Sequence, residues 1–99
     1  TKVGSLEGEP QARLAGRSVM GSLPEPEYNV NKSGKVVVRI NVNQYGSVIE
    51  ATAGVAGTTV QDRVLWEAAR KAALKAKFNL SSSAPAVQEG TITYIFKLR

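Results

Sequence analysis

The chain of 99 residues contains no cysteine and no histidine. Without cysteine, disulfides and thiolate metal sites are excluded. Without histidine, the commonest general base and metal ligand is missing, so Ser–His, Cys–His and His-zinc sites cannot be built. Among the carboxylates, Asp62 is best explained as a helix cap and lies on a different helix face from Glu67, while Glu50 and Glu89 stand alone. We therefore expect a binding module rather than an enzyme, with no cofactor and no catalytic or metal-binding residues.

Long hydrophobic runs are also absent, since no stretch approaches the ~18 apolar residues of a membrane-spanning helix. The composition, 42% hydrophobic and 21% charged, is that of an ordinary globular chain. The length suffices for one domain with a modest core. The first residue is not methionine, so we expect an excised soluble fragment, and an upstream signal or anchor remains open.

The first third of the chain gives few signs of regular structure. Residues 1–15 are polar and rich in Gly and Glu without a clear period, which is typical of a flexible linker remnant. Residues 16–31 contain Pro24 and Pro26, each of which pushes the preceding residue to extended geometry. We expect an extended arm there, with Leu23 and Tyr28 packed against the domain.

Three strands and one helix follow. Residues 35–43 alternate between branched aliphatic and mostly polar side chains, which predicts a half-buried strand. A hairpin loop with Gly46 leads to a second strand over residues 47–55, with a bulge expected near Ile49 and Glu50. Thr59 resembles the start of a capping box, which predicts a helix from there to about Phe78. Residues 90–99 form the third strand. The apolar helix stripe comprises Leu65, Ala68, Ala69, Ala72, Ala73 and Ala76.

These elements predict an α+β domain in which a three-stranded antiparallel sheet carries one helix on one face, in the order arm-β-β-α-β. A right-handed crossover favours the sheet order second, first, third. Direct pairing of the second and third strands is disfavoured only weakly. The last strand then lies at an edge, and Thr91 to Phe96 carry no charge, proline or bulge to guard it. Either a partner strand, the N-terminal arm or a second copy of the chain can cover that edge.

An ordered set of short motifs resembles the C-terminal domain of TonB-type energy transducers, in the form found in Bacteroidetes-like bacteria. The resemblance covers residues 16–99, and residues 1–15 resemble the end of that family's periplasmic linker. No single motif is specific, but their order is. The motifs are Gly16-Arg17, Leu23-Pro24-Glu25-Pro26-Glu27-Tyr28, Gly34-Lys35-Val36-Val37-Val38-Arg39-Ile40, Ala68-Ala69-Arg70-Lys71-Ala72, Lys77-Phe78 and Gly90-Thr91-Ile92-Thr93-Tyr94-Ile95-Phe96.

The resemblance implies a periplasmic domain of a protein that is anchored in the inner membrane and works with a proton-driven motor complex. Such domains bind the TonB box of outer-membrane transporters as a strand added beside the final strand, and so transmit energy for active uptake. The residues implied in partner binding are Pro24, Tyr28, Thr91, Thr93, Tyr94, Ile95, Phe96 and Lys97. Well-known members carry Gln-Pro-Gln-Tyr-Pro before the domain, and the acidic Glu25 and Glu27 depart from that pattern.

Two other functions stay open beside this one. A TolA-like domain has the same general architecture and serves envelope integrity. Arg63, Arg70 and Lys77 recur at about seven-residue spacing and suit a phosphate backbone, with Trp66 or Tyr45 as stacking partners. The few aromatics are not interleaved with the charges, so we do not expect nucleic-acid binding. A homodimer is also possible.

Overall fold

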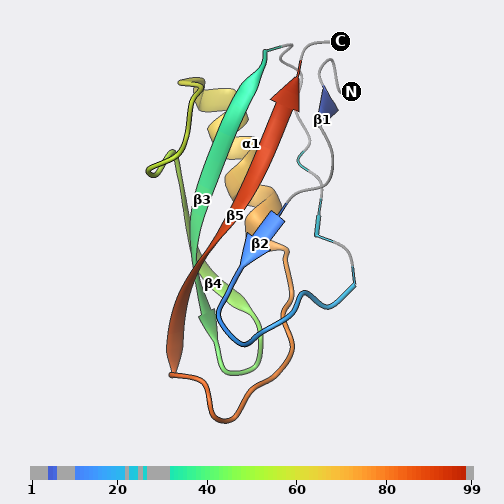
Figure 1. Ribbon diagram of the computed structural model, residues 1–99, viewed down its shortest axis with the longest axis vertical. Coiled ribbons are helices and arrows are strands. Elements are labelled where there is room, and N and C mark those ends of the chain that lie inside the picture. The colour runs from blue at the N-terminus through green and yellow to red at the C-terminus, as the bar shows by residue number, and fades with distance from the viewer. Residues whose placement is uncertain (1–4, 7–10, 22, 25, 27–31, 98–99) are drawn as a thin grey trace.

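The computed structural model describes residues 5–6, 11–21, 23–24, 26 and 32–97, and every structural statement below concerns these residues. The fold is a single antiparallel sheet with one helix on one face (Figure 1). The predicted α+β class is therefore confirmed. The elements in chain order are β1 (Ser5–Leu6), β2 (Gln11–Arg13), β3 (Gly34–Asn43), β4 (Val48–Ala53), α1 (Arg63–Leu74) and β5 (Val87–Lys97).

The sheet order is β1-β5-β3-β4, and β2 also pairs with β5. The predicted order of the three main strands is confirmed, because β3 lies between β4 and β5. The predicted strand number is wrong, because β1 and β2 both pair with the outer side of β5, which gives five strands in four positions across the sheet. These two strands have only two and three residues, too few to show an alternating pattern. They come from the segment that the sequence assigned to a linker.

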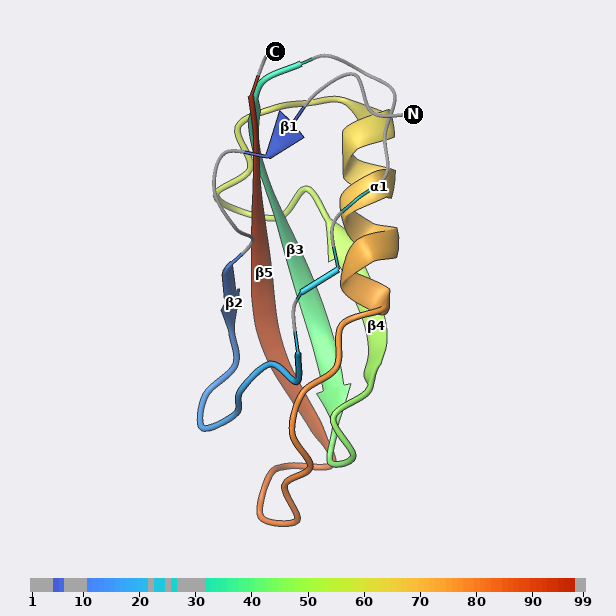
Figure 2. The ribbon, with the colours of Figure 1, turned by 90° about the vertical axis from the view of Figure 1, so that its right-hand side faces the viewer.

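The core lies between the sheet and α1, which covers one face of it (Figure 2). β3 is paired along its whole length with β5, from Gly34 opposite Phe96 to Asn43 opposite Val87. Its aliphatic side chains on the helix side are completely buried, as the alternation predicted. The buried residues of the two strands on that side are Val36, Val38, Ile40, Val42, Ile92, Tyr94 and Phe96.

The irregular pattern of the second strand corresponds to a β-bulge, as expected. Asn41 pairs with Glu50 and Val42 with Val48, so Ile49 is the extra residue. The bulge brings Val48 to the same face as Ala51 and Ala53, where all three pack against the core.

The helix is shorter than predicted at both ends. Asp62, not Thr59, is its N-cap, and the Asp62 carboxylate accepts a hydrogen bond from the Leu65 amide at 3.1 Å. Thr59 is engaged with β3 instead: its hydroxyl accepts from the Lys35 amide, and its own amide donates to the Lys35 carbonyl, both at 2.8 Å. The Lys32 ammonium, 2.8 Å from Asp62, and the Leu65 amide hold the pKa of Asp62 below its ordinary value. The helix ends at Leu74, and the chain that follows contacts the β3–β4 hairpin, where Lys77 bridges Ser47 and the Phe78 amide donates to the Gly46 carbonyl at 2.8 Å.

The predicted apolar stripe of α1 faces the sheet. Its alanines let the helix approach closely, and all six residues of the stripe and its continuation are buried. Trp66 covers the margin of the core, with its indole N–H donating to the Val60 carbonyl at 2.7 Å. Its ring stands over Gly54, where any side chain would come within 2.8 Å of it. On the exposed side of the helix, Glu67 forms an ion pair with Arg70, three residues on.

The close approach of α1 to the sheet predicts that larger side chains are not accommodated on its buried stripe. Ala72 is 4% exposed, so Ala72→Leu should lower the free energy of unfolding by about 1–3 kcal/mol through overpacking. The neighbouring Lys71 is exposed, and Lys71→Leu should change stability by less than about 0.5 kcal/mol. Urea denaturation of both variants measures the difference, and equal tolerance of leucine at the two positions would show that the helix face is misassigned.

Candidate binding site at the outer edge of β5

The backbone of β5 offers hydrogen-bonding groups on two sides. On β3, the Lys35 and Val37 backbone groups point away from β5, because they bond to Thr59 and to the amides of Gly54 and Val55. Backbone direction alternates along a strand, so the neighbours Val36 and Val38 bond to β5. Their partners on β5 are Tyr94 and Ile92. The backbone groups of the intervening residues, Thr91, Thr93, Ile95 and Lys97, therefore face the outer edge.

The chain's own N-terminal segment pairs with that edge. Arg13 lies opposite Thr91, and Gln11 lies opposite Thr93, both antiparallel to β5. Farther along, Ser5 lies opposite Lys97. Figure 1 shows β1 and β2 beside β5 on the side away from β3. This cover comes from the segment that the sequence assigned to a linker, which precedes the arm expected over residues 16–31.

The residues after β2 fix this segment to the domain. Leu14 is 7% exposed and belongs to the core. The Arg17 guanidinium donates to the carbonyl of Asn79 at 2.7 Å, to the carbonyl of Asn43 at 3.0 Å and to the Gln88 side chain at 3.3 Å. It thereby joins the N-terminal segment to the β3–β4 hairpin and to the loop before β5. The sequence singled out Arg17 only as part of a family motif, because its partners are backbone carbonyls that leave no pattern.

The structure separates the predicted binding residues on the last strand into two groups. Thr91, Thr93 and Ile95 lie on the face away from the helix and are partly exposed, Ile95 by 37%. Tyr94 and Phe96 are buried in the core, and their backbone groups face β3. Only the first group and Lys97 can bond an added strand through the outer edge.

The predicted arm is described only in part. Pro24 is half-buried, Leu23 packs against the core as expected, and Pro26 is fully buried. Tyr28, the other arm residue expected to contact a partner, lies outside the described residues.

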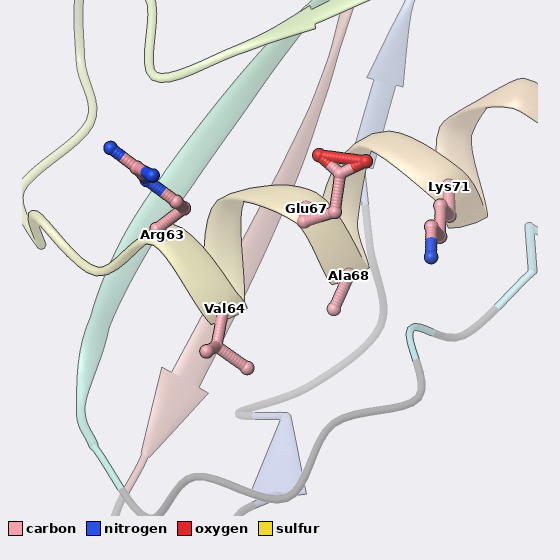
Figure 3. A pocket seen from close by; sticks show the side chains of 5 residues that line it. All are labelled: Arg63, Val64, Glu67, Ala68 and Lys71. Carbon is pink, nitrogen blue, oxygen red and sulfur yellow. The ribbon is translucent and has the colours of Figure 1, made fainter.

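The outer face of α1 carries the expected basic residues but offers little for stacking. Arg70 is engaged with Glu67, and Trp66 is packed against Gly54. An open hollow of about 350 Å³ is lined by Arg63, Val64, Glu67, Ala68 and Lys71 (Figure 3).

The described part of the chain holds no group of acidic, Cys or His residues able to bind a metal ion. None of its helices has the length and apolarity required to cross a membrane.

Tyr94 is the one described residue with a buried polar side-chain atom that lacks a hydrogen-bond partner. Burial raises the pKa of its phenol. Because an unsatisfied buried hydroxyl is unfavourable, Tyr94→Phe should raise the free energy of unfolding by about 1 kcal/mol. Tyr45→Phe, at an exposed hairpin position, is the control and should change it by less than about 0.5 kcal/mol. A loss of stability in Tyr94→Phe, measured by urea denaturation, would show that the hydroxyl has a partner.

The chain was compared with protein-family models, curated proteins and solved structures, and no match was found in any of the three.

Proposed function

We propose that this domain is a non-enzymatic binding module of the TonB type, which captures the TonB box of outer-membrane transporters by strand addition at the outer edge of β5. The observation that carries the proposal is the direction of the Thr91 and Thr93 backbone groups, which face away from β3 and pair with a short strand. An edge that pairs with one extended segment has the geometry to pair with another.

The make-up of this edge suits a partner recognised mainly through its backbone. Thr91, Thr93 and Ile95 are partly exposed and uncharged, so they place no strong demand on the partner's side chains. The side chains of β5 that face α1 are packed into the core, and β3 pairs with the strand along its whole length, so the strand is held in place from these two directions. The affinity then comes from main-chain hydrogen bonds, and neighbouring surfaces supply selectivity.

The wider role follows from the same family resemblance and is part of the proposal. The domain works in the periplasm, at the end of a protein held in the inner membrane by a helix upstream of this sequence. A proton-driven motor complex acts on that helix. The domain passes the resulting force to the transporter that its edge holds, and active uptake follows.

Proline substitutions in the two backbone phases of β5 test the proposed site. Thr93→Pro removes an outward N–H and should weaken binding of fluorescent peptides from transporter plug domains by roughly tenfold or more, while the thermal melt stays cooperative. Tyr94→Pro removes a bond to Val36 inside the sheet and should unfold the domain.

Thr93→Ala is the matched control, because it changes the side chain and keeps the N–H. Its peptide affinity should stay within about twofold of the wild-type value. If Thr93→Pro also stays within about twofold, the peptide binds elsewhere, with the arm around Pro24 and Tyr28 as the next candidate.

A further inference from the structure

We infer that β2 is a displaceable intramolecular cover of the binding edge, so that a partner strand enters by exchange with residues of the same chain. The inference rests on the proposed function only for the identity of the incoming strand. The cover itself follows from the pairing of Gln11 with Thr93 and of Arg13 with Thr91, the residues whose backbone groups face outward.

The side chains of the cover contribute little to its attachment. Gln11 and Arg13 are exposed, and Ala12 is only half-buried. The strand has three residues, whereas β3 pairs with β5 from Gly34 to Asn43. Backbone hydrogen bonds at a solvent-accessible edge open more readily than those of a packed core. The cover is therefore held much less firmly than the strand on the other side of β5.

The geometry at Gly90 shows how closely the chain crosses β5 after the cover. A side chain on Gly90 would lie 2.5 Å from the Arg13 carbonyl oxygen and 2.7 Å from Leu14. The nearest atoms all belong to the N-terminal segment, and the Gly90 backbone is not in the left-handed region. Glycine at position 90 therefore leaves room for Arg13 and Leu14 to pass close to β5. The backbone conformation of β5 does not itself require glycine there.

The tether at Leu14 and Arg17 makes the exchange reversible. Leu14 stays in the core, and the Arg17 guanidinium donates to the carbonyls of Asn43, Gln44 and Asn79. A released β2 therefore remains beside the edge. A segment tethered this closely competes at a high effective concentration. It returns when the partner leaves, and it keeps the edge from pairing with unrelated strands.

The backbone phase supplies a matched pair of variants. Arg13 and Gln11 lie opposite residues that face outward, so their amides point at β5, whereas the Ala12 amide points away from it. Arg13→Pro therefore removes a hydrogen bond of the cover. Ala12→Pro inserts the same ring one residue away without removing such a bond.

Amide hydrogen exchange of the whole chain, followed by NMR, tests the cover without any partner. In Arg13→Pro the Thr91 and Thr93 amides should exchange roughly tenfold or more faster than in the wild type. The Ile92 and Tyr94 amides, which bond to β3, should keep their protection. In Ala12→Pro all four should exchange within about threefold of the wild-type rates. Unchanged protection of Thr91 and Thr93 in Arg13→Pro overturns the inference.

The wild-type chain provides a second measurement should Arg13→Pro fail to fold. At low denaturant, Thr91 and Thr93 should exchange through an opening that leaves Ile92 and Tyr94 closed. If all four amides open together, β2 is an integral part of the fold and the inference is wrong.

Two peptides separate the cover from the proposed function. A synthetic peptide of residues 5–14 should bind Arg13→Pro and should not bind the wild type, in which the tethered cover excludes it. Transporter plug peptides should bind Arg13→Pro more tightly than the wild type. If the first peptide behaves as stated and no plug peptide binds, the cover stands and the proposed function fails. If plug peptides bind both chains equally, the cover does not compete with them and the inference fails.

Discussion

The hydrogen-bonding capacity of β5 is the constraint on which the rest of the structure depends. Each strand residue directs its N–H and C=O to one side, and successive residues alternate. β3 satisfies Tyr94 and Ile92, and the intervening Thr91 and Thr93 must find partners elsewhere. Unpaired backbone groups at the edge of a sheet can pair with another strand, so an added strand is the natural partner for this position.

The position of the single helix explains why a strand, and not a helix, covers the outer side of β5. α1 covers one face of the sheet through a narrow alanine stripe, and the loop after β4 closes over Val37 on the other face. Neither element reaches the outer side of β5. At the opposite edge, the bulge at Ile49 and the charge of Glu50 interrupt β4. The two edges of the sheet are therefore unequal, and the longer, uninterrupted one is the edge with the N-terminal cover.

Alternation and helical spacing predicted the main elements, because those patterns arise from burial. Val36, Val38, Ile40 and Val42 repeat every second residue and proved to be core, and so did the alanine stripe of α1. The start of α1 was misplaced because the Thr59 hydroxyl accepts a hydrogen bond from the Lys35 amide and does not cap the helix. These two residues are 24 positions apart, so no local sequence pattern indicates the contact.

The sequence predicted that the last strand lies outside the three main strands, but it did not predict the short strands that pair with its outer side. The lack of guards on Thr91 to Phe96 indicated an edge strand, whereas β2 has too few residues to show a period and owes its structure to the edge beside it. The backbone phase also needed the structure, since Thr93 and Tyr94 look equally suited in the sequence. Arg17 was missed as an anchor because its partners include the backbone carbonyls of Asn43 and Asn79, which are distant in the sequence and leave no pattern in it.

The most direct test of the account is an isotope-filtered NOE experiment on the labelled domain with an unlabelled transporter plug peptide. The account predicts contacts between the peptide backbone and the Thr91 and Thr93 amides, together with loss of the cross-peaks that join Arg13 to Thr91. Peptide contacts that appear elsewhere, while the Arg13–Thr91 cross-peaks persist in the saturated complex, would contradict it.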